Sequence, residues 1–213
     1  MQQPLAYCCG MNQTAVLLPY LVFCIVMTGT PGPNNAMALT SGARVGLWRS
    51  MPLVSGIAVG VALQLTAIGL GLGAAFRAAP LLHDILRLGG SSYLLWLAFK
   101  IARSGPLEAD GGGRAPVGFV GAAAFRWINP KAWAITTSAV ATYVPAGDYA
   151  SNIGIAAALL ALVAIPCVSV WAAAGMALRR LLADPRYARA FNVAVALVLV
   201  ATTLPMLFDE VAV

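Results

Sequence analysis

Hydrophobic residues occur in six long runs, and short polar stretches separate one run from the next. The runs cover, approximately, residues 16–39, 51–76, 85–101, 117–144, 153–178 and 191–208. Apolar and polar residues do not alternate along them with the period of two that is typical of membrane strands. A helix that spans a membrane needs about 20 predominantly apolar residues, a length that the runs approach or exceed. The pattern therefore predicts an all-α integral membrane protein with six transmembrane helices.

The composition leaves too few charged residues to cover the surface of a soluble protein. The mean hydropathy is +0.85, and only 9% of the residues are charged, whereas soluble domains have about 25%. We expect one transmembrane transporter domain over residues 1–213. No Lys or Arg precedes the first run, whereas a cleaved signal peptide begins with a basic region. The first run therefore predicts a retained helix. Residues 1–10 add nothing to the pattern, which makes Met11 an alternative start to Met1.

Basic residues gather in the loops after the first, third and fifth runs. These loops hold Arg44, Arg49, Lys100, Arg103, Arg114, Arg179, Arg180, Arg186 and Arg189, and the other side holds Arg77 and Arg87. The positive-inside rule then predicts that these three loops are cytoplasmic and that both termini lie outside, in the periplasm. Because the net charge of +6 is distributed over loops and forms no stripe on one face, no nucleic-acid partner is expected.

Two proline motifs interrupt the apolar runs. The first run contains Pro31-Gly32-Pro33-Asn34-Asn35, and the fourth contains Asn129-Pro130-Lys131. Proline lacks a backbone donor and clashes with the preceding turn, so each motif predicts a broken helix. In lipid, such a break is tolerated only where the freed backbone groups face protein or a water-filled cavity. Each motif is therefore a candidate binding site for a polar ligand, and a kink satisfied by neighbouring helices is the alternative.

The two motifs occupy corresponding places in the two halves of the chain, in the first helix of each half. Three spans per half require opposite orientations, so we expect two inverted three-helix repeats, at about 14–103 and 116–210. A glycine-rich cytoplasmic linker at about 104–115 would separate them. Paired broken helices in such repeats point to a transport site near the membrane midplane.

Polar side chains near these breaks are the candidate substrate-binding residues. They are Pro31, Gly32, Pro33, Asn34, Asn35, Gln64, Asn129, Pro130 and Lys131. The asparagine amides can donate and accept, and Gly32 is expected to let the backbone turn freely. Gln64 could bond either a substrate or a neighbouring helix. Gly56 and Gly60 form a GxxxG pattern, which predicts close helix packing.

Lys131 needs a partner, because a lysine at the centre of a membrane costs about 2.5–3.5 kcal/mol. All seven acidic residues can be placed in loops or tails. Three alternatives stay open for Lys131: a substrate carboxylate, carbonyls freed by the first break, or snorkelling toward the cytoplasmic face. Arg126 lies nearer the cytoplasmic end of its run, so we expect it to snorkel.

Catalytic and metal-binding signatures are missing from the sequence. It has no HExxH motif, and its four cysteines and single histidine lack metal-ligand spacing. We therefore expect neither an enzyme nor a cofactor or metal.

The same motifs resemble those of the LysE/RhtB family of bacterial amino-acid exporters. The resemblance covers the chain from about Met11 and rests on Thr30-Pro31-Gly32-Pro33-Asn34, Gly42-Ala43-Arg44-Val45-Gly46, Gly56, Gly60, Gly69-Leu70-Gly71, Leu88-Gly89-Gly90-Ser91-Ser92-Tyr93-Leu94-Leu95-Trp96-Leu97 and Trp127-Ile128-Asn129-Pro130-Lys131-Ala132-Trp133. The last motif is similar to the branch that contains cysteine and O-acetylserine exporters. That branch often has glutamine where this chain has Arg126.

The resemblance implies a multi-pass protein of the bacterial inner membrane that exports amino acids or close derivatives, with proton coupling. Its Pro-Gly-Pro and Asn-Pro-Lys elements correspond to Pro31, Gly32, Pro33, Asn34, Asn129, Pro130 and Lys131. Amino-acid substrates and the lipid bilayer are the expected partners, and a homo-oligomer stays open. The alternatives are a non-transporting membrane scaffold or assembly protein and a channel for a small solute.

Overall fold

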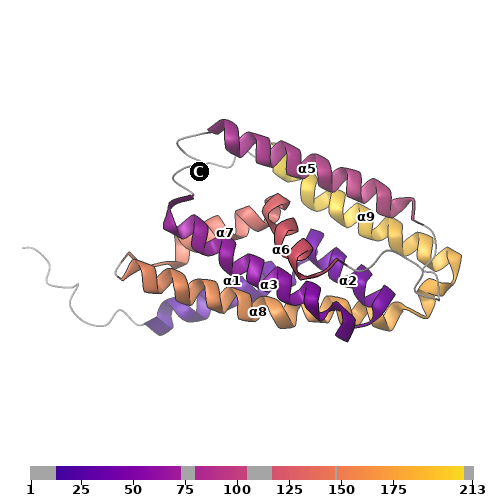
Figure 1. Cartoon of the computed structure of the whole chain (residues 1–213), viewed down its shortest axis with the longest axis horizontal. Helices are drawn as coiled ribbons and strands as arrows, with labels where there is room; N and C mark the ends of the chain where they lie inside the picture. The colour runs from indigo at the N-terminus through magenta and orange to yellow at the C-terminus, as the bar shows by residue number, and fades with distance from the viewer. Residues whose placement is uncertain (1–12, 73–79, 105–116, 147, 209–213) are drawn as a thin grey trace, which may run out of the picture.

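The computed structural model describes residues 13–72, 80–104, 117–146 and 148–208, which are 90% helical and contain no strand. The longer helices are α1 (Gln13–Gly29), α2 (Pro33–Val45), α3 (Met51–Ala67), α5 (Pro80–Ala102), α6 (Phe119–Ile128), α7 (Pro130–Tyr143), α8 (Tyr149–Leu178) and α9 (Pro185–Phe208) (Figure 1). Short helical turns η1 (Trp48–Ser50), η2 (Ile68–Leu72) and η3 (Leu181–Ala183) connect or extend them. The all-helical prediction is confirmed.

Both predicted helix breaks are present. The axes of α1 and α2 differ by 58°. Asn129 separates α6 from α7, and its side chain caps α7 by accepting a hydrogen bond from the backbone N–H of Lys131 at 3.1 Å. Pro130 occupies the first position of α7, where no intrahelical donor is needed. Each break therefore follows from local proline chemistry.

By length and composition, three described helices can each cross a membrane alone: 48–72, 149–178 and 185–204. The bent pair α1–α2 can form a fourth span, and α6 is a shorter apolar helix. The described residues thus support a multi-pass membrane protein, while the arrangement of six spans stays a prediction.

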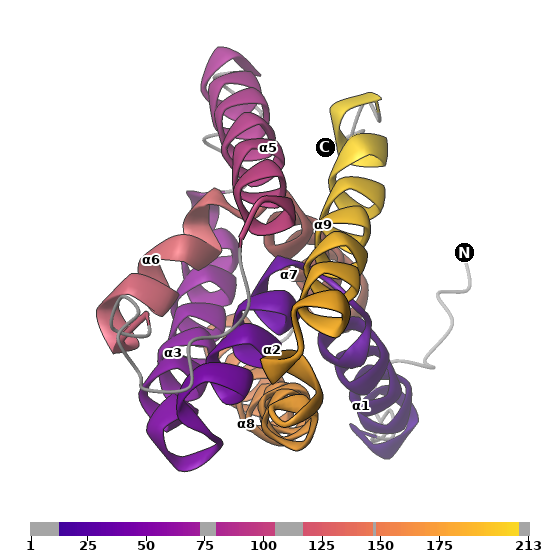
Figure 2. The ribbon, with the colours of Figure 1, turned by 90° about the vertical axis from the view of Figure 1, so that its right-hand side faces the viewer.

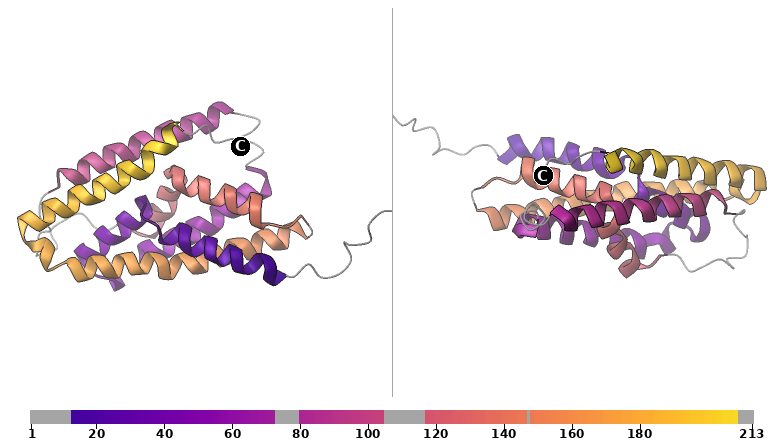
Figure 3. Two further views of the ribbon diagram at one scale, coloured as in Figure 1. Left: turned by 180° about the vertical axis from the view of Figure 1, so that it is seen from behind. Right: turned by 90° about the horizontal axis from the view of Figure 1, so that it is seen from above.

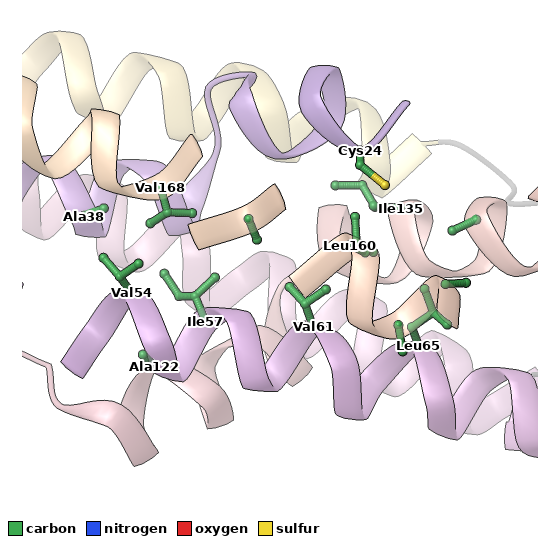
Figure 4. Close-up of a cluster of buried hydrophobic side chains, with 14 of the residues drawn as sticks. Cys24, Ala38, Val54, Ile57, Val61, Leu65, Ala122, Ile135, Leu160 and Val168 are labelled. Carbon is green, nitrogen blue, oxygen red and sulfur yellow. The ribbon is translucent and has the colours of Figure 1, made fainter. Parts of the chain in front are cut away.

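Helices α3 and α8 form the centre of the main hydrophobic core. They run antiparallel, because Gly69 beyond α3 lies against Ile153 near the start of α8. Val54, Ile57, Val61 and Leu65 of α3 interleave with Leu160 and Val168 of α8 (Figure 4). Gly56 lies against the backbone of Phe119 and Gly60 against Ala123, both in α6. The predicted GxxxG packing is confirmed.

Helices α5 and α9 lie side by side along one flank of the molecule (Figures 1 and 2). The pair is antiparallel, since the Asn192 amide donates to the carbonyl of Ser104, just beyond the end of α5, at 2.9 Å. A second hydrophobic cluster joins this pair to α2 through Ala36, Leu39, Ala98, Val195 and Leu199. The flank pair and the remaining helices form two layers when seen from behind (Figure 3).

Candidate functional site

The two helix breaks contact each other through Lys131. Its Nζ donates to the carbonyl of Thr30 at 3.1 Å, to Thr30 Oγ1 at 2.9 Å and to the carbonyl of Pro31 at 2.8 Å. An ammonium group has three hydrogens, so these contacts use its full donor capacity. Of the three alternatives for Lys131, the contact with carbonyls freed by the first break is the one that the structure shows. We call this set of contacts the Lys131 clasp.

The backbone carbonyls freed by the two prolines all have partners. Pro31 cannot donate to Met27, and Thr30 Oγ1 donates to that carbonyl instead at 3.2 Å. Pro33 cannot donate to Gly29, and Trp171 Nε1 replaces it at 3.0 Å. These substitutes keep the break stable within an apolar surrounding.

Asn35 completes this arrangement on the α2 side. Its amide nitrogen donates to the carbonyl of Thr28 at 2.8 Å and to that of Thr30 at 2.7 Å. The side chain is buried, with 4% of its surface exposed. In this conformation Asn35 therefore stabilises the break itself.

Gly32 is required for a different reason from the expected one. Its φ of 179° and ψ of 179° describe extended backbone, which any residue can adopt. A Cβ placed there would lie 3.0 Å from Cδ and 3.1 Å from Nζ of Lys131. The prediction that Gly32 supplies conformational freedom is wrong, and its missing side chain makes room for the lysine.

The second break also contacts the first through two asparagines. The Asn129 amide donates to Asn34 Oδ1 at 3.4 Å. Asn129 is 2% exposed and also caps α7. It therefore links the start of α7 to the start of α2, beside the Lys131 clasp.

A cavity of about 30 Å³ lies between the breaks. Six of the nine predicted site residues line it: Gly32, Pro33, Asn34, Asn35, Asn129 and Lys131. Pro31, Pro130 and Gln64 do not. A water molecule needs about 10–15 Å³ of such space, so this cavity has room for a few waters and is too small for an amino acid.

Arg126 lies in the wall of this cavity, contrary to expectation. It is only 3% exposed, and neither Nε nor Nη2 has a hydrogen-bond partner among the described residues. The prediction that it snorkels to the cytoplasmic face is wrong. Its position near the end of α6, against α3, turns it toward the break; the run of apolar residues gave no signal of this direction.

Gln64 is fully buried in α3, one helical turn beyond Val61, which lines the cavity. Neither Nε2 nor Oε1 has a partner within the described part of the chain. The alternative in which Gln64 bonds a neighbouring helix is therefore not observed there.

A larger cavity of about 540 Å³ lies between α2 and α5. Pro33 lines both cavities, and Arg44 and Lys100 line the larger one. Tyr93 and Trp96 contribute an aromatic wall. The two cavities thus adjoin at the first helix break.

Comparison with known proteins identifies a family for this chain. Residues 25–209 match the family described as LysE type translocator. The chain is 30% identical to a cysteine/O-acetylserine efflux protein of Escherichia coli (strain K12), over 87% of this chain and 94% of that protein. It is 31% identical to a protein of the same name from Shigella flexneri serotype 5b (strain 8401), over 88% and 95%. No solved structure matches the chain significantly.

These relatives are named as transporters and not as enzymes. The comparisons therefore support the prediction of an amino-acid exporter, and they agree with the resemblance drawn from motifs along the chain. The match covers both helix breaks and most of the helices. This chain belongs to the LysE type translocator family.

Proposed function

We propose that this protein exports small amino acids across the bacterial inner membrane, and that its substrate site lies between the two helix breaks. Cysteine and O-acetylserine are the first candidates, since the relatives are named for their efflux. The proposed site comprises Gly32, Pro33, Asn34, Asn35, Asn129 and Lys131 around the small cavity. Pro31 and Pro130 create the breaks, and Gln64 would lie on the outward part of the path.

The Lys131 clasp is the observation that carries this proposal. It joins two broken helices that lie about a hundred residues apart in the chain. An amino acid cannot enter a cavity of about 30 Å³, so the two breaks must separate during transport. Hydrogen bonds between the breaks then help to hold the closed form.

The packing of the helices supports the proposed inverted repeats. The repeats pair α1–α2 with α6–α7, α3 with α8 and α5 with α9. A two-fold axis in the membrane plane would exchange the contact of α3 and α6 with that of α8 and α1. It would likewise exchange α2–α8 with α7–α3, and all four contacts are present. The two self-paired contacts, α3–α8 and α5–α9, are antiparallel, as such an axis requires.

The larger cavity is the proposed entrance from the cytoplasm. Arg44 and Lys100 line it, and the positive-inside rule predicts that both lie on the cytoplasmic side. Their charges would attract the carboxylate of an amino acid. Pro33 adjoins both cavities, so movement of the first break would connect the entrance to the site.

Two further features belong to the proposal: both termini lie outside, and export is coupled to protons. A homo-oligomer stays an open alternative to a monomer. Proton coupling predicts that collapsing the pH gradient across vesicles slows export against a concentration gradient. Flux of the solute that does not depend on the proton gradient would instead favour the channel alternative.

Metabolite profiling tests the proposed function. Medium from cells that overproduce the protein should contain several-fold more of the exported amino acid than medium from cells that lack the gene. Uptake of the same compound into inside-out vesicles should require the protein. A membrane scaffold would change neither measurement, and unchanged amino acids in both assays would overturn the proposal.

A further inference from the structure

We propose that Arg126, and not Lys131, receives the carboxylate of the substrate. This inference rests on the proposed function and adds a specificity-determining residue to its site. The ligand class is an amino acid with a free carboxylate and a small side chain, either polar or apolar. The argument depends on the burial of Arg126, on the cavity that it lines and on its lack of a described partner.

The guanidinium of Arg126 is buried beside the two breaks. The residue is 3% exposed and lines the small cavity with Asn129 and Lys131. Its Cβ lies 3.5 Å from the place that a Cβ on Gly60 would occupy, so the absence of a side chain at Gly60 lets α6 approach α3 closely. The base of the Arg126 side chain therefore lies against α3 at Gly60, and the residue lines the cavity from there.

No described acidic side chain neutralises this charge. Asp148 precedes α8 and Asp184 precedes α9, and neither lines the cavity. Within the described ranges, Nε and Nη2 of Arg126 also lack any hydrogen-bond acceptor. A buried charge without a partner is strongly unfavourable. A site that binds an anion during its cycle accounts for retaining such a charge.

Lys131 is less suited to the same task in this conformation. Its three hydrogens are used by Thr30 and Pro31. The guanidinium presents five N–H groups in a planar fork that matches the two oxygens of a carboxylate. We therefore assign the two cations different tasks: Lys131 holds the breaks together, and Arg126 binds the carboxylate.

Ligand pairs that differ only in the carboxylate test this assignment. Purified full-length protein in detergent is titrated with L-cysteine and L-cysteinamide, and with L-serine and L-serinamide, and binding is read from the rise in melting temperature. The wild-type protein should bind the acid of a pair at least ten-fold more tightly than the amide. In Arg126→Gln this preference should vanish, and in Arg126→Lys part of it should return. Arg189→Gln, at an exposed arginine, should keep the wild-type preference.

A second readout separates binding from a structural role. Without ligand, Arg126→Gln should melt no lower than the wild type, because it removes an unpaired buried charge. A structural arginine would show the opposite. In the wild-type protein alone, added L-cysteine should protect Arg126 from modification by phenylglyoxal, as mass spectrometry would record.

Equal binding of acids and amides by the wild type, or an unchanged preference in Arg126→Gln, would overturn the inference. If Arg126→Gln fails to fold, the absence of protection by L-cysteine in the wild type would overturn it equally. The proposed function has a separate failure. It would be wrong if the protein bound the acid more tightly than the amide but did not transport the acid across a membrane.

Discussion

Lys131 is a cation that lies between helices without a carboxylate partner among the described residues. Its three acceptors are the Thr30 carbonyl, the Thr30 hydroxyl and the Pro31 carbonyl. Hydrogen bonds to a charged group contribute about 1.5–3 kcal/mol each. Together they can offset the cost of about 2.5–3.5 kcal/mol for a lysine at membrane depth. The two features that looked unfavourable separately, freed carbonyls and a buried cation, thus satisfy each other.

Replacing Lys131 by alanine should abolish export and destabilise the protein. The carbonyl of Pro31 would lose its donor, and the unfolding free energy should fall by about 1–3 kcal/mol for the unsatisfied acceptor. Export from cells and the melting temperature of the purified protein measure the two effects. Arg189→Ala removes an exposed cation as a matched control and should change neither. Wild-type export by Lys131→Ala would contradict the role of the clasp.

At the residue scale, the sequence predicted the positions of the two breaks and of the buried lysine better than the contacts of the side chains. Proline chemistry alone located both breaks, and the position of Lys131 beside the second break identified its need for a partner. The choice among its partners depended on how α7 faces α1, which no local pattern encodes. Arg126 was misjudged for the same reason, because distance along a helix does not tell which neighbour its side chain meets.

Small residues determine how closely the helices approach one another. A Cβ at Gly175 of α8 would collide with the backbone of Leu39 in α2, and one at Gly42 of α2 would collide with that of Ala172 in α8. Gly56 has the same relation to Phe119 in α6. Close packing of this kind fixes α2 and α6, one helix from each break, against α8 and α3.

Two glycines of α8 provide a matched test of this packing. Gly175→Ala should destabilise the protein by about 1–3 kcal/mol through overpacking. Gly154 has no atom within 4 Å of its Cβ position, so Gly154→Ala should be neutral or stabilise the helix by up to about 1 kcal/mol. Melting temperatures in one detergent compare the two. Equal effects would contradict the close approach of α2 and α8.

The extent of the helices was largely predictable, because apolar runs in a membrane protein must be helical. The contacts between them were less so. GxxxG in α3 predicted close packing, but not that α6 would be the partner. The corresponding role of Gly42 and Gly175 had no comparable signal, since the two glycines lie on different helices.

At the scale of the whole molecule, the main contacts of α3 with α6 and of α2 with α8 have counterparts in those of α8 with α1 and of α7 with α3. This pattern agrees with the proposed inverted repeats, as do the antiparallel pairs α3–α8 and α5–α9. The long-range pairing of the halves could not be derived from sequence, because the repeats share little beyond a proline motif. The opposite orientation of the two halves is predicted by the loop charges and stays a prediction.

Membrane orientation has a direct test. Single cysteines are introduced at Arg49, Tyr149 and Arg179, all exposed, in a chain whose four native cysteines are replaced. A membrane-impermeant maleimide should label Tyr149→Cys in cells whose inner membrane is intact. Arg49→Cys and Arg179→Cys should react only after that membrane is permeabilised. The reverse pattern would invert the proposed topology and move the entrance to the opposite side.

The central claim is that the substrate passes between two breaks joined by Lys131, and two glycines of the first break test it most directly. Nothing lies within 4 Å of a Cβ at Gly29, whereas one at Gly32 would lie 3.0 Å from Cδ and 3.1 Å from Nζ of Lys131 and would crowd that side chain. Uptake of labelled L-cysteine into proteoliposomes should be unchanged in Gly29→Ala and at least ten-fold slower in Gly32→Ala. Adding Gly32→Ala to Lys131→Ala should lower the melting temperature no further than Lys131→Ala alone, because both substitutions act on one contact. Equal uptake by Gly29→Ala and Gly32→Ala, with equal amounts of folded protein, would contradict the account.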